Sequence, residues 1–177
     1  MEEKILLWVQ ENLRFDWLTP IVKGITYLGN AGILWIILSA LFLIFKKTRK
    51  TGLMTSTALI FDLLSVNILI KNIVARTRPY EVIDGLVSLI GQQSDKSFPS
   101  GHTAASFAFV AVLWFMAPKK VSIPLTVLAS FIALSRLYLG VHYPTDIIGG
   151  IAVGMICGIL AVILVEFIEK KIKKEAH

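Results

Sequence analysis

Apolar residues along this chain fall into long uninterrupted blocks, without the alternation of apolar and polar positions that half-buried strands show. Five such blocks predict helices that cross a membrane, because a crossing takes about 20 apolar residues and shorter blocks suit thin or partly buried crossings. The blocks are residues 31–45, 52–70, 103–117, 121–134 and 147–165. The pattern therefore predicts an all-α fold, an integral membrane bundle.

The first 29 residues are less uniform. Near the start, apolar residues at helical spacing stand beside charged ones, which predicts an N-terminal interfacial helix that lies on the membrane surface; they are Ile5, Leu6, Trp8 and Val9. The start lacks the basic region and cleavage site of a secretory signal, so we expect it to remain on the protein. Residues 18–28 contain Lys23 but are otherwise apolar enough for a short crossing. We therefore expect about six transmembrane helices in a single domain, residues 1–177.

Composition supports a membrane protein, since 55% of the residues are apolar and the mean hydropathy is +0.73. A net charge of +6 would suit nucleic acid, but ten of the 18 basic residues are gathered within residues 46–50, 119–120 and 170–174. By the positive-inside rule these groups mark cytoplasmic helix ends. We therefore expect no nucleic-acid partner, a multi-pass protein of the cell membrane with both termini cytoplasmic, and polar motifs that face the non-cytoplasmic side.

Two features inside the apolar blocks have a structural explanation. Asp62 and Asn67 would be costly against lipid, so they should face the bundle interior, where a structural hydrogen bond is favoured over a catalytic role. In the last block a small residue recurs every four positions, which suits close helix packing within the bundle better than a dimer face. These residues are Gly150, Gly154 and Gly158.

The first polar motif runs from Lys71 to Pro79, directly after a crossing. Lys71 and Arg78 are seven residues apart, or two helical turns, and should share a helix face. Pro79 disfavours helix at Arg78, so the chain should leave the helix there and carry the guanidinium over a pocket. Taken alone, such a basic helix end is typical of lipid headgroup contact or snorkelling.

The second motif is Phe98-Pro99-Ser100-Gly101-His102, just ahead of an alanine-rich apolar block. Pro, Ser and Gly there predict a helix start whose free N–H groups and dipole attract phosphate. An ordinary loop and N-cap with an incidental histidine is an equally good interpretation of this segment alone.

The third motif is Ser135-Arg136 followed by residues 142–146. Pro144 suits the first turn of the last helix, which leaves His142 just before it and Asp146 within it, close enough to hydrogen-bond. A carboxylate that holds one ring nitrogen leaves the other oriented and more nucleophilic. A structural His–Asp pair at a helix start is the alternative.

Together the motifs supply cations, helix-start amides, two histidines and a carboxylate, which is the inventory that phosphoryl transfer needs. The sequence has no paired carboxylates or His-x-x-x-His spacing on the same side to hold Mg²⁺ or Zn²⁺. We therefore expect no metal and no cofactor. Ser100 as the nucleophile with His102 as its base is a weaker alternative, because the two lie only two residues apart in a phosphate-binding turn.

The order Lys-x6-Arg-Pro, Pro-Ser-Gly-His and Ser-Arg-x5-His-x3-Asp resembles the type-2 phosphatidic acid phosphatase family, and the match spans residues 71–146. The family also includes vanadium haloperoxidases and glucose-6-phosphatase, and its core has six helices. The small size and short loops look most similar to the bacterial phosphatidylglycerophosphatase B and undecaprenyl-pyrophosphate phosphatase group. The resemblance implies a lipid phosphatase that acts on phosphatidylglycerophosphate, phosphatidic acid or undecaprenyl pyrophosphate.

The resemblance also implies a role for each site residue. His142 would attack phosphorus to form phosphohistidine, Asp146 would orient it, and His102 would protonate the leaving group before water resolves the intermediate. The phosphate would be held by Lys71, Arg78, Ser100, Gly101 and Arg136. A soluble haloperoxidase is set aside because the apolar blocks would not tolerate water. A lipid-headgroup transporter or flippase without hydrolysis is the alternative, although it leaves the two histidines and Asp146 unexplained.

Overall fold

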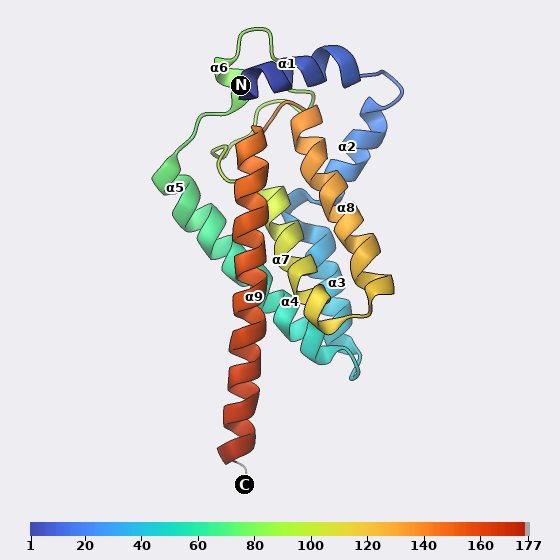
Figure 1. Cartoon of the computed structure of the whole chain (residues 1–177), viewed down its shortest axis with the longest axis vertical. Helices are drawn as coiled ribbons and strands as arrows, with labels where there is room; N and C mark the ends of the chain where they lie inside the picture. The colour runs from blue at the N-terminus through green and yellow to red at the C-terminus, as the bar shows by residue number, and fades with distance from the viewer. Residues whose placement is uncertain (176–177) are drawn as a thin grey trace.

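The computed structural model describes residues 1–175, and this part of the chain is helical with no strand (Figure 1). The all-α prediction is therefore confirmed. In chain order the elements are α1 (Glu2–Leu13), α2 (Thr19–Leu28), the 3₁₀ turn η1 (Asn30–Gly32), α3 (Ile33–Ile44), α4 (Arg49–Asp62), the π-helical η2 (Leu63–Ile70), α5 (Lys71–Val74), α6 (Pro79–Val82), α7 (Gly101–Met116), α8 (Lys119–Tyr138) and α9 (Pro144–Glu175).

Three helical stretches in the described residues are long and apolar enough to cross a membrane: Arg49–Val82, Lys119–Tyr138 and Pro144–Glu175. A fourth crossing is available if Thr19–Leu28 and Asn30–Ile44, bent by 42°, act as one broken span. Helix α7 is apolar but shorter, with 16 residues. The expected six crossings are therefore not found as six separate long helices.

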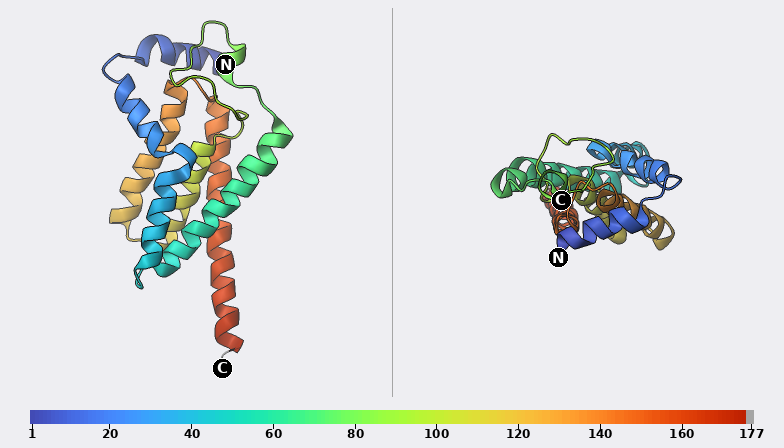
Figure 2. Two further views of the ribbon diagram at one scale, coloured as in Figure 1. Left: turned by 180° about the vertical axis from the view of Figure 1, so that it is seen from behind. Right: turned by 90° about the horizontal axis from the view of Figure 1, so that it is seen from above.

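The separate crossing expected for residues 18–28 is replaced by a bent unit. Helix α2 has ten residues, or about 15 Å, against a hydrocarbon core of about 30 Å. Ala31 (φ 48°) and Gly32 (φ 67°) then adopt left-handed conformations, and the chain continues into α3 at a new angle (Figure 2). The sequence placed a helix end here correctly, but the break turns the chain without returning it across the bundle.

The described N-terminus lies at the same end of the molecule as the polar motifs. Helix α1 runs across that end (Figures 1 and 2), with Leu6 buried against Ile83 and Leu86. Glu2 accepts hydrogen bonds from Thr145 at the start of α9, whereas the end of α9 lies at the far end of the molecule (Figure 1). The prediction that both termini share a side is therefore wrong. The interfacial placement of α1 remains a prediction.

Helix α7 is the centre of the bundle and packs closely against α9. A Cβ at Gly154 would meet the backbone oxygen of Ala104, and one at Gly158 would lie 2.7 Å from that of Ala108. The glycine stripe of α9 therefore packs within the bundle, as predicted. Because α7 is short, it begins deeper in the bundle than the neighbouring ends of α8 and α9 (Figure 1), so the cavity beside its first residues is recessed.

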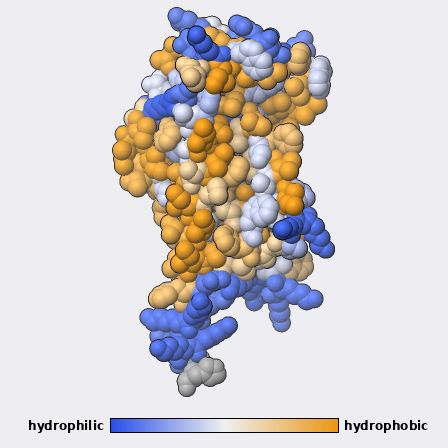
Figure 3. Space-filling view, viewed as in Figure 1, coloured by the Kyte–Doolittle hydropathy of each residue, from blue (hydrophilic) through white to orange (hydrophobic). Residues whose placement is uncertain are grey.

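The face of the molecule in Figure 3 carries a broad apolar belt between two polar ends. Large apolar side chains on the long helices are about half exposed, among them Ile36, Ile60, Phe131, Ile148 and Ile163. Soluble monomers rarely expose apolar patches of more than a few hundred Å². The belt is therefore compatible with a protein that is embedded in a membrane.

Candidate active site

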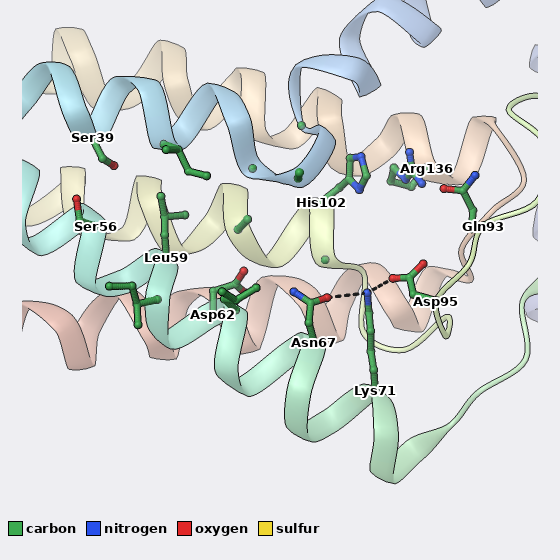
Figure 4. Close-up of a pocket in the computed structure, with 18 of the residues that line it drawn as sticks. Ser39, Ser56, Leu59, Asp62, Asn67, Lys71, Gln93, Asp95, His102 and Arg136 are labelled. Atoms are coloured by element: carbon green, nitrogen blue, oxygen red, sulfur yellow. Dashed lines mark hydrogen bonds and ion pairs between the residues drawn. The ribbon is translucent and has the colours of Figure 1, made fainter.

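A cavity of about 620 Å³ opens beside the start of α7 and extends between α3 and α4 (Figure 4). At its polar end it is lined by residues of all three sequence motifs, as the sequence predicted: Lys71, Arg78, Gly101, His102, Arg136 and His142. Ser100 and Asp146 are not among the lining residues and lie behind this surface.

Lys71 reaches the cavity from the end of the α4–η2–α5 helical run. The prediction that Lys71 and Arg78 share a helix face is wrong, because α5 ends at Val74. Ala75 adopts a left-handed conformation (φ 49°) and donates its N–H to the oxygen of Lys71 at 2.9 Å. This αL turn redirects the chain, and Arg78 lines the cavity from an extended segment.

The start of α7 has the cap that the sequence predicted. Ser100 is the N-cap, and its Oγ accepts from the N–H and the hydroxyl of Thr103 at 3.4 and 3.0 Å. Its own N–H donates to the backbone oxygen of Asp146, so Ser100 ties the second motif to the third. A Cβ at Gly101 would lie 3.4 Å from Nζ of Lys71. The glycine therefore leaves the space that an anion between helix start and ammonium would need.

His102 is held by the bend between α2 and α3. Its Nε2 lies 2.9 Å from Oδ1 of Asn30, so a proton on this nitrogen is donated to the amide oxygen. A Cβ at Gly29 would come within 2.9 Å of the imidazole and 2.8 Å of Ile132. The bend thus positions His102 and leaves room for its ring.

His142 and Asp146 form the predicted pair at the start of α9, which begins at Pro144. Nδ1 of His142 lies 3.3 Å from Oδ2 of Asp146. The same oxygen accepts from the hydroxyl of Ser97 at 2.5 Å and from the N–H of Tyr143 at 2.9 Å. A carboxylate with this many donors is fixed in position, so it also fixes the imidazole.

The second carboxylate oxygen of Asp146 is bound by Arg76, at 2.8 Å from Nη1. The guanidinium also lies over the ring of Tyr143, at 3.8 Å from its centroid, and donates to Glu2 at 2.7 Å. Glu2 in turn accepts from Thr145. Helix α1 therefore contributes to a shell of charges around the His142–Asp146 pair.

The imidazole of His142 is almost completely buried, with 1% of the residue exposed. Burial and the nearby charges of Arg78 and Arg136 outweigh the hydrogen bond to Asp146 and lower its pKa to about 4. The ring is therefore neutral near pH 7, with the Nδ1 proton directed at Asp146. Its Nε2 lies 3.2 Å from Nη1 of Arg78, where a lone pair can accept a hydrogen bond or attack an electrophile.

Arg136 is a buried cation that has no acidic partner in the part of the chain that the structure describes. The residue is 1% exposed, and its Nη1 donates a hydrogen bond to the hydroxyl of Thr26 at 2.7 Å. Its Nε has no partner, and no carboxylate of residues 1–175 forms an ion pair with it. Because a buried charge needs compensation, this guanidinium is suited to an anionic ligand.

Asp95 was not predicted as a site residue, but its carboxylate binds two of the residues that were predicted to hold phosphate. It forms ion pairs with the ammonium of Lys71 and with Nη2 of Arg78, the latter at 2.6 Å. Burial opposes ionisation of Asp95, but the hydrogen bond and charge of Lys71, with those of Arg78, lower its pKa to about 2. The carboxylate is therefore ionised at neutral pH.

The remaining length of the cavity is mostly apolar. It runs past Ile36, Leu43 and Leu59, and Figure 4 shows Asp62 directed into it. Oδ1 of Asp62 has no hydrogen-bond partner in the described residues, so the structural hydrogen bond expected there is not found. The hydrogen bond expected for Asn67 is found, since its Oδ1 accepts from Nζ of Lys71 at 3.1 Å.

Several contributors were missed by sequence reasoning. Arg76 lies inside the first motif and Ser97 directly precedes the second, and these positions were a usable signal. Asn30, Asp95 and Glu2 lie outside the three motifs and gave no such signal. In the described residues no group of three or more His, Cys, Asp or Glu side chains is arranged to hold a metal ion.

Comparison with known proteins identifies the family of the chain. The PAP2 superfamily model matches residues 51–170. Phosphatidylglycerophosphatase B of Bacillus subtilis is 31% identical over 175 residues, 92% of this chain and 80% of that protein. An undecaprenyl-diphosphatase of Sulfolobus acidocaldarius is 32% identical over 128 residues, 72% of this chain. The match spans 62% of that relative's length.

Solved structures show the same likeness. LpxE of Aquifex aeolicus superposes with a TM-score of 0.79 at 26% identity, covering 90% of this chain and 93% of the other. The PAP2-type phosphatidylglycerolphosphate phosphatase of Bacillus subtilis gives a TM-score of 0.73 at 30% identity, covering 97% of this chain and 85% of the other. On its sequence, its fold and the arrangement of its three motifs, the chain belongs to the PAP2 superfamily.

Proposed function

We propose that this protein is a membrane lipid phosphatase that hydrolyses a phosphate monoester or pyrophosphate through a phosphohistidine, without a metal ion. The observation that carries the proposal is the buried guanidinium of Arg136, which has no ion-pair partner within residues 1–175 and lies in the same cavity as the neutral His142. An anionic group that enters the cavity compensates the cation and comes within reach of a nucleophile. Named phosphatases among the relatives support the same reaction class.

The first half-reaction follows from the pairing of His142. Its Nε2 lone pair attacks phosphorus while Asp146 accepts the Nδ1 hydrogen bond and stabilises the imidazolium that forms. The bond from phosphorus to the lipid oxygen breaks, and His102 supplies the proton that this oxygen takes up. Lys71, Arg78, Arg136 and the amides at the start of α7 stabilise the charge on the equatorial oxygens.

In the second half-reaction a water molecule attacks the phosphohistidine, and His102 accepts a proton from it. The P–N bond breaks, inorganic phosphate is released and neutral His142 is restored. Ser100 supports this step indirectly, since it fixes the start of α7. Whether its hydroxyl also touches phosphate remains a prediction.

The substrate class is supported by the shape of the cavity. Its polar end holds the cations, and its apolar part between α3 and α4 offers space for a lipid chain. The relatives' names include lipids with one polyprenyl chain and lipids with two acyl chains. Phosphatidylglycerophosphate, phosphatidic acid and undecaprenyl pyrophosphate are therefore the substrates to compare first.

The active site is proposed to face the non-cytoplasmic side. The three groups of Lys and Arg lie at the end of the bundle opposite the cavity, after α3, after α7 and along the end of α9. By the positive-inside rule that end is cytoplasmic. With the Cys157→Ser background, an impermeant thiol reagent added outside should label Gln92→Cys and spare Lys119→Cys. The reverse pattern would invert the orientation.

A transporter or flippase needs the cations but has no use for a nucleophile held by Ser97, Arg76 and Asp146. Purified protein in detergent should release phosphate from at least one of the three lipids. Release should persist in excess chelator. Activity that is lost with chelator and restored by Mg²⁺ or Zn²⁺ would disprove the metal-free mechanism, and lipid binding without release would favour the transporter.

A further inference from the structure

The carboxylate of Asp95 bridges the two cations at the entrance of the phosphate site. Its Oδ2 pairs with Lys71 and its Oδ1 with Arg78, and the pairing with Lys71 is drawn in Figure 4. The two cations are almost completely buried, whereas 47% of the Asp95 side chain is exposed. The anion thus sits at the solvent side of a fixed cationic pair.

The carboxylate uses donors that a phosphate group would need. Nη1 of Arg78 is engaged by Val141 and lies beside His142, and Nε donates to the backbone oxygen of Asp95. Nη2 is the guanidinium nitrogen that points to the carboxylate. Lys71 has Asn67 as its other partner. Two phosphate oxygens can replace two carboxylate oxygens at these donors, but both anions cannot hold the same positions together.

We propose that Asp95 is an internal competitor for the phosphate site, which holds Lys71 and Arg78 while the site is empty, moves aside for the substrate and returns to displace inorganic phosphate. This inference rests on the proposed phosphatase function and adds a residue that controls anion affinity and product release.

The required movement is a rotation of one side chain. The backbone of this segment is held by bonds that do not involve the carboxylate. Nε of Arg78 donates to the backbone oxygen of Asp95 at 2.9 Å, and the N–H of Ser97 donates to the backbone oxygen of Arg76 at 2.9 Å. The exposed carboxylate can turn into solvent while these bonds persist. No closure of a loop is needed.

When a competitor occupies the site, the apparent dissociation constant of an anion equals the intrinsic constant divided by the fraction of time for which the site is free. If the carboxylate occupies the cations about nine-tenths of the time, the apparent dissociation constant of an anion rises about tenfold. The gain is faster release of the product phosphate, which would otherwise remain on three cations.

Asp95→Asn tests the proposal, since it keeps the shape of the side chain and removes its charge. The dissociation constants of inorganic phosphate and of vanadate should fall about tenfold by titration calorimetry of the detergent-purified protein. Inhibition by phosphate should strengthen equally, and KM should fall. Asp84→Asn is the matched control, because it removes the same charge from an exposed position of the same loop and should leave anion affinity unchanged.

The opposite sign would overturn the proposal. If Asp95 only holds the two cations in place, its loss should weaken phosphate and vanadate binding, and unchanged affinity would also contradict a competitor. Asp95→Ser should show the same gain in anion affinity. Asp95→Glu keeps the carboxylate and should bind anions as tightly as the wild type, so the result does not depend on one variant. Anion binding is measured without lipid, so tighter binding in a protein that hydrolyses no lipid phosphate would refute the proposed function alone.

Discussion

Nδ1 of His142 lies 3.3 Å from Oδ2 of Asp146, one helical turn away at the start of α9, while Nε2 of the same ring faces Arg78. The carboxylate cannot donate when ionised, so the Nδ1 position carries the shared proton and Nε2 keeps its lone pair. This arrangement fixes the tautomer and, in the proposed mechanism, the direction of attack.

On the acid side of the pH–rate profile, activity should be lost only at a pH well below the pKa of an ordinary histidine; this part of the profile is the acid limb. Burial lowers the pKa of His142 to about 4, so the reactive neutral ring is lost only as the pH falls through about 4. We expect the NMR titration of this imidazole in the free enzyme to show that midpoint. A midpoint near about 6.5, the value of an unperturbed histidine, would mean that the ring is solvated.

Arg76 is predicted to position the catalytic pair without touching the substrate. In Arg76→Gln the charge of Asp146 is less compensated, which favours the protonated imidazole, so the pKa of His142 should rise and the acid limb should move to higher pH. We expect kcat to fall while KM changes little, and Arg76→Lys to recover part of the loss. Lys4→Gln removes an exposed cation from α1 and serves as the control. A change in KM alone would place Arg76 in substrate binding instead.

Arg136 should be hard to replace even by lysine. A guanidinium presents a planar fork to two phosphate oxygens, whereas an ammonium is a point charge, and the Nε of Arg136 is free to contribute. We expect Arg136→Lys to lower kcat/KM by about 10²–10³, the effect of losing one oriented donor to the transition state. Arg49→Lys, at the opposite end of the bundle, should be close to wild type. Near-normal turnover of Arg136→Lys would remove this residue from the phosphate site.

The local structure of the motifs was predictable because it obeys short-range rules. Ser100 and Pro144 mark helix starts through capping and through the fixed φ of proline, and both helices begin where these rules place them. Apolar blocks likewise located the long helices. These features depend on neighbours within a few residues, which a single sequence displays.

The rest of the site depends on contacts between distant segments. Arg76 and Asp146 are 70 residues apart, and His102 and Asn30 are 72 apart, with no local pattern to pair them. The left-handed conformations of Ala31 and Ala75 are also set by tertiary context, since alanine favours right-handed helix. Ala75 explains why a helical spacing of seven gave the wrong relation between Lys71 and Arg78.

Loss of His102 and loss of His142 should have different effects on substrates that differ in their leaving group. A lipid alkoxide needs a proton as it departs, whereas nitrophenolate scarcely does, so loss of His102 should matter less for nitrophenyl phosphate in the first half-reaction. His142→Ala should remove reaction with both kinds of substrate, because no imidazole remains to receive the phosphoryl group.

Rapid mixing of His102→Ala with nitrophenyl phosphate should therefore give a burst of about one equivalent of nitrophenol, the kinetic mark of a covalent intermediate. Slow turnover should follow, because in the proposed mechanism His102 also activates the water that hydrolyses phosphohistidine. The lipid substrate should be almost inert in this variant. Asn30→Ala, which frees Nε2 of His102 from its 2.9 Å partner, should slow the lipid reaction more than the nitrophenyl burst. A burst in His142→Ala with none in His102→Ala would exchange the two roles, and no burst in either would remove support for the phosphohistidine.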